Sequence, residues 1–451
     1  MASSWLWVAA PLCGAAGVTF LACNSSGTAL PPQDAGAAQD VVHFEGATPY
    51  DAGNVADSPG PADGGAEAEG GPPPRRLLLT YNGSSESEIV AFGLKSKAVD
   101  GRLTFGDSLG SAYAGTTAPW LLEQFDDVVG RLDAQQPWVL DATWSVAMND
   151  LSDAGYAQGY SDPQAVLVGA GAKAYVLRYN RNLVAVLDTS LSPDGGAPAG
   201  SIDLTGEVQA GGDGYVQPVG GVYVAAQNRV YAVLGNIDRF DVVNQGYNLL
   251  CANTTPTVIA IDTTSDTLVD LNGAAPGDGW PLVGYNPAQG PTGFAYDPAT
   301  GPAGRLLVLE AGCNEVDADG GVGALVKREV ESIDLATGQA TRLLDLTGGG
   351  FPYNLTYVDA HHAVVAADQV YAWDPTTTSL GAPIANAPES FVYDGAGNLV
   401  GMNTDYDADG GVTGYEVVST ALADGTATTL GTFEFTPTNG FPGGVALWPA
   451  P

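Results

Sequence analysis

From Arg76 onward the chain carries short apolar runs of four to seven residues, rich in Val, Leu, Ile and Tyr and separated by Gly, Pro, Asn and Asp. Runs of this length are typical of β-strands, and the residues between them favour turns. No segment has the periodicity of an amphipathic helix of three turns. The pattern therefore predicts an all-β domain of many short strands.

Two phrases recur along this domain. The first is an apolar strand that ends in an aspartate, whose carboxylate can cap the turn that follows; the aspartates are Asp133, Asp188, Asp262, Asp334 and Asp374. The second is a proline that opens an apolar strand, found at Pro163, Pro218, Pro291, Pro352, Pro388 and Pro442. Another strand lies between each proline phrase and the next aspartate, and a shorter strand follows the aspartate.

Units of four antiparallel strands are the blades of a β-propeller, and the chain contains seven of them. The first unit, at RLLLTYN, lacks its first strand, whereas the last proline phrase, GFPGGVALW, has no blade after it. We therefore expect the C-terminal strand to complete the N-terminal blade and close the ring, which removes the sheet edges. The segment from Ser111 to Asn149 matches the repeat poorly.

Two of the repeats, AYVLRYNRNLVAVLDTS and VYDGAGNLVG, resemble those of YVTN-type and similar bacterial β-propellers. The resemblance extends over residues 76 to 451. It implies a propeller fold and, across that family, chiefly binding or surface roles, with enzymes a minority. Because a fold does not fix a function, it leaves the ligand undetermined.

The N-terminus reads as an export signal over residues 1–22, because Trp5 to Ala22 carries no charge and the small Ala22 precedes Cys23. The segment FLACNSS resembles a bacterial lipoprotein signal, which implies that Cys23 is lipidated and becomes the mature N-terminus. A plain cleaved signal and an uncleaved membrane anchor are the alternatives. All three place the rest of the chain outside the cytoplasm, in the periplasm or on the cell surface.

Residues 23–75 are predicted to form a disordered tether. Positions 24 to 74 hold eight acidic residues, no Lys or Arg, and the segments PPQDAG, DSPGPADGG and GGPPP. Such a composition buries too little apolar surface to fold, and its like charges keep it extended. A spacer that lifts the propeller, residues 76–451, off the membrane is the functional interpretation, and a low-complexity segment without a role is the alternative.

The net charge limits the kinds of ligand, and the cysteine content predicts a disulfide. The 451 residues carry a formal net charge of -36, which argues against any partner bound through phosphates, nucleic acid above all. We expect a monomer. Beyond Cys13 and Cys23 the exported domain keeps Cys251 and Cys313, which we expect to form a disulfide in an oxidising compartment, with two separate buried thiols as the alternative.

The longest connections between second and third strands lie in the fourth, fifth and seventh blades, and such connections share one face of a propeller. Long loops are usually functional or disordered, so this face is the candidate binding surface. Short loops beside them would add a further set of side chains: Tyr81, Glu123, Arg178, Tyr179, Arg181, Arg239 and Glu310. The arginines would be an anion-sensing feature if they converge, and solvated loop arginines otherwise.

The loop DYDADGGVTGYE matches the calcium-binding loop of EF-hand proteins. The match makes Asp405, Asp407 and Asp409 the carboxylate ligands. Gly410 would form the sharp turn, Gly411 would supply a backbone carbonyl, and Glu416 would be the closing ligand. We therefore expect Ca²⁺ as a cofactor here, although strands rather than helices flank the loop. A second loop, with Glu315, Asp317, Asp319 and Gly320, repeats the first half of the calcium pattern but has Val326 at the closing position. The alternative for both loops is that the recurring DADGG is only a compositional habit of the chain.

The segment FGDSLG matches the signature of GDSL-type serine hydrolases. The resemblance implies Ser108 as nucleophile, Asn149 at the oxyanion, and Asp359 with His362 as the base pair. That family alternates strands with long helices, which this chain lacks, and the DAHH segment falls at a hairpin of the repeat. Asp359, His361 and His362 are no stronger as a metal site.

We expect a lipid-anchored, extracytoplasmic binding or scaffold propeller for an unknown protein or small molecule, with the hydrolase as the alternative.

Overall fold

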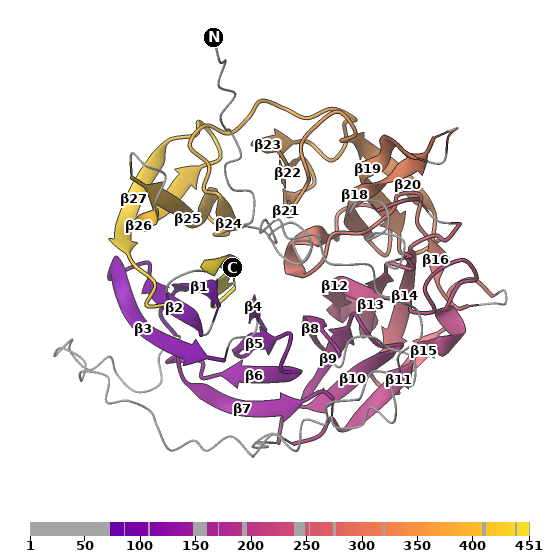
Figure 1. Ribbon diagram of the computed structural model, residues 1–451, viewed down its shortest axis with the longest axis horizontal. Helices are drawn as coiled ribbons and strands as arrows, with labels where there is room; N and C mark the ends of the chain where they lie inside the picture. Colours follow the sequence, from indigo (N-terminus) through magenta and orange to yellow (C-terminus); the bar gives the residue numbers. More distant parts are fainter. Residues whose placement is uncertain are drawn as a thin grey trace, which may run out of the picture.

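The protein is described by a computed structural model that covers residues 73–450, except for residues 85, 107–108, 148–159, 170, 192–195, 239–248, 252, 274–276, 318, 320, 408–411 and 438–439. These residues form seven antiparallel sheets around a central axis (Figure 1). The predicted all-β, seven-bladed propeller is confirmed. Its described helices are three short 3-10 helices, η2 (Thr205–Glu207), η3 (Ala225–Gln227) and η4 (Pro291–Gly293). None of the helices described is long and apolar enough to cross a membrane.

The blades, named A to G in chain order, are listed from the innermost strand outward. Blades A to C are β28 (Gly440–Trp448), β1 (Arg76–Gly83), β2 (Ser87–Gly93) and β3 (Ala98–Phe105); β4 (Gly110–Ala114), β5 (Pro119–Glu123), β6 (Val128–Leu132) and β7 (Leu140–Ser145); and β8 (Pro163–Val168), β9 (Lys173–Arg178), β10 (Leu183–Asp188) and β11 (Gly200–Asp203).

The same order holds in the second half of the ring. Blades D to G are β12 (Pro218–Val224), β13 (Arg229–Leu234), β14 (Thr257–Asp262) and β15 (Thr267–Val269), with β16 (Trp280–Pro281) also paired to β14; β17 (Phe294–Asp297), β18 (Arg305–Val316), β19 (Val322–Asp334) and β20 (Ala340–Asp345); β21 (Asn354–Asp359), β22 (His362–Ala366) and β23 (Val370–Trp373); and β24 (Ser390–Tyr393), β25 (Asn398–Tyr406), β26 (Val412–Ala421) and β27 (Ala427–Phe433).

Burial explains why the apolar runs are continuous in some strands and interrupted in others. In β1 the consecutive residues Leu77, Leu78 and Leu79 have no exposed surface, because a central strand of a blade is covered by neighbouring blades on both sides. In the outermost strand β3, exposed and half-buried residues alternate. The core therefore lies between the blades: one apolar cluster joins blades B, C and D, and another joins blades G and A.

The recurring aspartates cap turns as the sequence predicts. In each of the five, a carboxylate oxygen accepts the backbone N–H two residues later, at 2.8 to 2.9 Å; the acceptors are Asp133, Asp188, Asp262, Asp334 and Asp374. The amide of Thr264 in this way lowers the pKa of Asp262 below its ordinary value. These turns follow the third strand of a blade and, in four of the five blades concerned, lead into the fourth.

The ring is closed between the two ends of the chain. β28 runs antiparallel to β1, with Leu447 opposite Leu77, so the C-terminal strand is the innermost strand of the N-terminal blade. The indole Nε1 of Trp448 also donates to the carbonyl of Ala134 in blade B, at 2.8 Å. This confirms the predicted closure.

Two blades differ from the expected repeat. Blade B, the segment that matches the repeat poorly, is a regular four-stranded sheet in the structure. Blade F has three strands, and the expected fourth is reduced to a single bridge between Tyr371 and Pro383. A proline has no N–H to donate, which limits the pairing that this outer segment can form.

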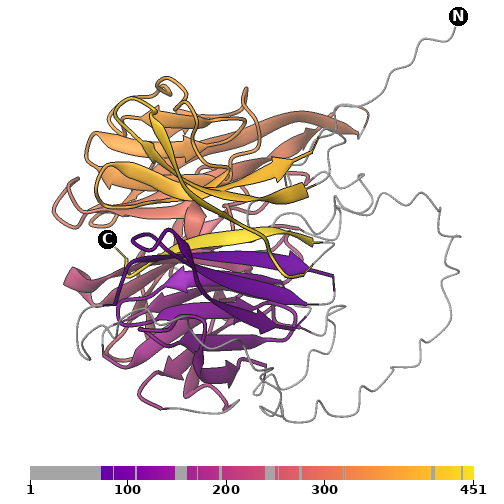
Figure 2. The same cartoon turned by 90° about the vertical axis from the view of Figure 1, so that its left-hand side faces the viewer.

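The antiparallel order gives the propeller two distinct ends. In each blade the innermost strand begins at the same end at which the second strand meets the third, because the strands of a blade alternate in direction. We call this end the hairpin face and the other the opposite face. Figure 2 shows the long hairpins β18–β19 and β25–β26 projecting on the same side of the molecule.

Candidate functional site

The side chains predicted for the binding face lie at the hairpin face but are buried. Five of them sit near the ends of β1, β5 and β9 or in the turn after β9, and Glu310 lies in the middle of the long strand β18. Each is at most 9% exposed; the described members are Tyr81, Glu123, Arg178, Tyr179, Arg181 and Glu310. Arg239 lies outside the described residues. The six side chains therefore lie below the surface of the hairpin face and are not exposed on it.

The two arginines brace backbone between blades B and C. Arg178 is 2% exposed and donates from Nη1 to the carbonyl of Val146 at 2.6 Å. Arg181 is 5% exposed and donates from Nη1 to the carbonyls of Asn180 and Tyr160, at 2.8 and 3.2 Å. Carbonyl groups hold these guanidinium groups in place, so the interpretation as solvated loop arginines is wrong for both.

Buried carboxyl groups accompany them. Burial, with a contribution from the nearby Asp126, raises the pKa of Glu123 to about 7. Burial also raises the pKa of Asp162 to about 7, against the hydrogen bond from Gln164. Asp127 instead accepts the N–H and the hydroxyl of Ser161, both at 2.6 Å, which ties a turn of blade B to the start of blade C. The hairpin face thus rests on a layer of polar groups inside the fold.

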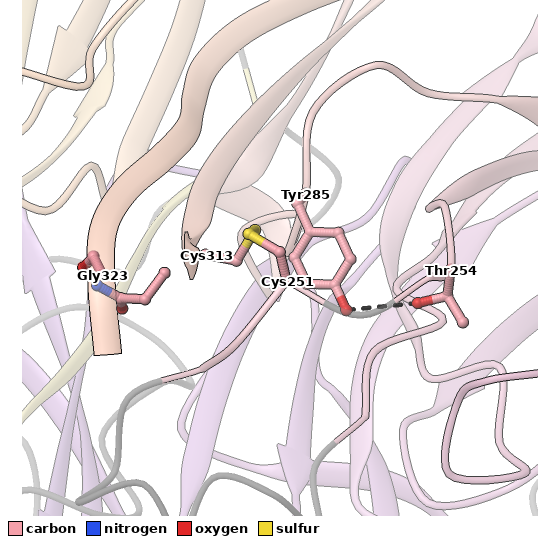
Figure 3. The surroundings of a disulfide bond; sticks show 6 residues. Cys251, Thr254, Tyr285, Cys313 and Gly323 are labelled. Carbon is pink, nitrogen blue, oxygen red and sulfur yellow. Dashed lines mark hydrogen bonds between the residues drawn. A yellow bond between two sulfur atoms is a disulfide. The ribbon is translucent and has the colours of Figure 1, made fainter. Parts of the chain in front are cut away.

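A disulfide links the long connection of blade D to the long hairpin of blade E (Figure 3). Cys251 and Cys313 are joined across 62 residues of sequence, with Cα atoms 5.1 Å apart. Beside the bridge, the N–H of Cys251 donates to the carbonyl of Asn314 at 2.9 Å. The pairing is the one that the cysteine count predicts, and it indicates an oxidising, extracytoplasmic compartment.

A groove at the hairpin face separates blades G and A. It has a volume of about 760 Å³ and is lined by Arg102, Asp405, Thr413, Gly414, Tyr415, Thr432, Phe433, Glu434, Phe435 and Thr436. The ring of Phe435 lies edge-on to that of Tyr415, with centroids 4.8 Å apart, and stacks on that of Tyr81. This groove combines an aromatic floor with polar walls.

Arg102 fixes one wall of this groove. Its Nη1 donates to both carboxylate oxygens of Glu88, at 2.9 and 3.0 Å, and its Nη2 to the carbonyl of Glu434 at 2.8 Å. Glu88 is buried and also accepts the N–H and hydroxyl of Thr436. Sequence reasoning missed this site. The alternation of Phe433, Glu434 and Phe435 was visible, but Arg102 lies more than 300 residues earlier in the chain.

Two of the candidate calcium ligands lie in a regular hairpin. Asp405 is opposite Gly414 in the pairing of β25 with β26, and Glu416 is opposite Asn403. Glu416 also accepts a hydrogen bond from the hydroxyl of Thr429 on β27. The closing position thus faces the outer strand. Asp407 is described, and Asp409, Gly410 and Gly411 are not, so calcium binding by this loop stays a prediction.

The second acidic loop caps its own turn. Asp317 accepts the backbone N–H groups of Asp319 and Gly321 through Oδ1, at 3.0 and 2.6 Å. Within the described part of the chain, no three His, Cys, Asp or Glu side chains are grouped so that they could hold a metal ion.

The hydrolase residues are not assembled by the described structure. Nδ1 of His362 lies 2.8 Å from Oδ1 of Asp359, and their side chains are 71% and 55% exposed. This pair occupies the β21–β22 turn, at the opposite face. Ser108 and Asn149 lie outside the described residues, but Phe105 and Gly110, which bracket Ser108, are at the hairpin face. Among the described residues, the structure brings together the Asp–His pair, at the end opposite to Phe105 and Gly110.

The calcium prediction can be tested by comparing the melting temperature of the protein in calcium with that in chelator. With a dissociation constant near 10⁻⁴ to 10⁻³ M, a few millimolar calcium should stabilise the protein by about 1 to 2 kcal/mol relative to chelator. Asp407→Ala should remove the shift, whereas Glu416→Gln should keep most of it because Glu416 is bonded to Thr429. A parent protein without a calcium-dependent melting temperature, or an Asp407 variant that retains the full shift, would contradict the prediction.

Comparison with known proteins gives likeness of shape alone. No family model and no curated protein sequence matches the chain. Among solved structures, it is similar to AztD from Citrobacter koseri, with 10% identity, a TM-score of 0.44 and coverage of 83% of this chain and 97% of that one. It is also similar to the dihydro-heme d1 dehydrogenase NirN in complex with DHE, with 11% identity, a TM-score of 0.41 and coverage of 82% and 74%. A chain of a nidogen–laminin complex gives 11% identity and a TM-score of 0.37, with coverage of 83% and 98%. With identities and scores this low, no functional conclusion follows.

Proposed function

We propose that this chain is a lipid-anchored, extracytoplasmic binding propeller that presents its hairpin face to a protein partner of the cell envelope. The observation that carries the proposal is the distribution of exposed large apolar side chains in the described structure. Those at the hairpin face are Val283, Val316, Val322, Phe351, Tyr406 and Val412, against Val139 and Leu191 at the opposite face. On each long hairpin two of them are cross-strand partners, Val316 with Val322 and Tyr406 with Val412, and exposed apolar surface of this kind is used in protein–protein contacts.

The two long hairpins repeat one another at their tips. Each carries an acidic residue, an apolar residue and then the sequence Asp-Ala-Asp-Gly-Gly-Val, at residues 315–322 and 405–412. They flank blade F, in which the corresponding turn between β22 and β23 spans only residues 367–369. The two tips therefore offer the same chemistry at two places on one face.

The charge of the tips selects the kind of partner. No Lys or Arg occurs in residues 313–326 or 398–421, and the whole chain has a net charge of -36. Complementarity favours a partner surface that combines apolar contacts with Lys or Arg. The same charge repels phosphate, so nucleic acid is not proposed as a ligand. The chain is taken to act as a monomer.

The anchor is the second part of the proposal. It rests on the uncharged segment that ends at Cys23 and on the acidic, proline-rich residues that follow, of which those up to residue 72 lie outside the described residues. The disulfide supports an extracytoplasmic location. A tether of this composition would hold the propeller away from the membrane surface and leave the hairpin face accessible.

The lipid anchor predicts in which cell fraction the protein and its Cys23 variant are found. Substituting Cys23→Ser should move the protein from the membrane fraction to the soluble fraction, because acyl chains hold a protein to a bilayer stably and their absence does not. The measurement is immunoblotting of fractionated cells. An unchanged distribution would contradict the lipid anchor and leave the binding proposal to its own test.

Partner binding predicts that the tips matter and the other end does not. A variant with Val316→Ser, Val322→Ser, Tyr406→Ser and Val412→Ser should bind at least about tenfold more weakly, a loss of about 1.4 kcal/mol or more. Capture from solubilised envelopes, followed by titration of the captured protein, measures the effect. Binding should also weaken with salt, as expected for a basic partner.

The matched control substitutes the exposed apolar residues of the opposite face, Val139→Ser and Leu191→Ser. This control should bind as the parent does. Equal binding by the tip variant and the parent, or an equal loss in the control, would contradict the proposed binding face.

A further inference from the structure

A short segment crosses the hairpin face between blades D and E. It comprises residues 282–289, which we call the strap. The strap extends the inner edge of β18 through three backbone hydrogen bonds of 2.8 to 2.9 Å: Ala288 N–H to Leu309 O, Ala311 N–H to Asn286 O, and Gly312 N–H to Tyr285 O. It is therefore held to blade E by bonds that local opening would break.

Glu331 on β19 holds the beginning of the strap. Its Oε2 accepts the backbone N–H of Gly284 at 2.6 Å and that of Val283 at 2.9 Å. Burial raises the pKa of Glu331 to about 7, and the two amide donors oppose this rise. Glu331 is the acceptor that fixes the strap to β19.

Glu310 on β18 lies directly beneath the strap. It is 0% exposed, and within the described part of the chain neither of its carboxylate oxygens has a hydrogen-bond partner. A Cβ placed on Gly284 would lie 2.3 Å from Cγ of Glu310, so the strap packs on this side chain at a position where only glycine fits. A charge on Glu310 would be both unsolvated and in contact with the strap.

The surrounding carboxylates act in the same direction, and Lys327 opposes them. Register places Glu329 opposite Glu310 on β19, with Glu331 two residues further on. On β20, Arg342 lies 3.5 Å from Glu329, and Asp345 also faces Glu329. Lys327 lies over the ring of Tyr285, and the strap itself contains no charged residue. Burial, and then Glu331 and Glu329, raise the pKa of Glu310 well above its ordinary value.

We propose that the strap is a proton-controlled latch: it is closed while Glu310 carries a proton, and it opens the hairpin face between blades D and E when that proton is lost. The closed form binds the proton more tightly than the open form, in which Glu310 meets water. The closed form is therefore favoured at low pH, and the advantage is lost as the pH rises from the ordinary range of a glutamate through the raised value. Opening exposes the part of the hairpin face that lies between Val283 and the β18–β19 hairpin, which carries the disulfide.

Hydrogen–deuterium exchange of the intact protein tests the latch. Protection factors, corrected for the intrinsic pH dependence of exchange, would be measured between pH 6 and 9 for peptides spanning the strap and for the β1–β2 pair of blade A. Strap protection should fall by up to about tenfold per pH unit where Glu310 titrates, because opening releases one proton. Protection of β1–β2 should stay constant over the same range.

Two substitutions at Glu310 and one matched control make the test specific. Glu310→Gln and Glu310→Met remove the ionisable proton at similar volume, so strap protection should remain high at pH 9 and keep only the smaller pH dependence that Glu331, with its pKa of about 7, contributes. Glu123→Gln removes a different buried acid of the same face and should leave the pH dependence of the strap unchanged. A parent strap with constant protection, a Gln variant with the slope of the parent, or a Met variant that is open at pH 9 would overturn the proposal.

Discussion

The pairing of β28 with β1 is the constraint on which the rest of the structure depends. It joins residues more than 350 positions apart in the sequence, with Leu77 opposite Leu447 and the hydroxyl of Thr80 donating to the carbonyl of Gly444. Only when this strand is in place is blade A covered on its inner edge and packed against blade G. A blade buries its strands against its neighbours, so an open ring would leave apolar faces and two sheet edges in water.

The same closure creates features that no single repeat contains. The groove between blades G and A has Arg102 on one wall and the β26–β27 region on the other, and Glu88 and Thr436 hold the connection to β28 in place. The disulfide performs a similar task between blades D and E, where it fixes one long connection to the adjacent hairpin. Long connections at the hairpin face are thus held by contacts with the neighbouring blade, and their tips remain exposed.

Features that depend on local pattern were predictable from the sequence. The aspartate turns need only a carboxylate and the amides that follow it, and the blade count follows from the two recurring phrases together with the incomplete units at the two ends. The closure followed from a missing strand at one end and an extra strand at the other. The disulfide followed from two cysteines in an exported domain. Blade B was harder to recognise because it lacks the proline phrase, although its turn at Asp133 is capped like the others.

Features that depend on segments distant in sequence were not predictable. Arg178 lies at the end of β9 and Glu310 within β18, and their burial depends on what crosses above or beside them. For Glu310 this is the strap, in which Gly284 packs against the side chain. For Arg178 it includes the carbonyl of Val146, from the preceding blade. A repeat pattern fixes where a strand ends, and it does not report which connection covers that end.

Removing the closing strand tests this account most directly. A chain that lacks residues 438–451 should lose cooperative thermal unfolding and near-ultraviolet circular dichroism, because Leu77, Leu78 and Leu79 would lose their cover, and a synthetic peptide of residues 438–451 should restore both signals. A truncated chain that melts cooperatively at the temperature of the parent, without the peptide, would contradict the claim that the β28–β1 pairing holds the propeller together.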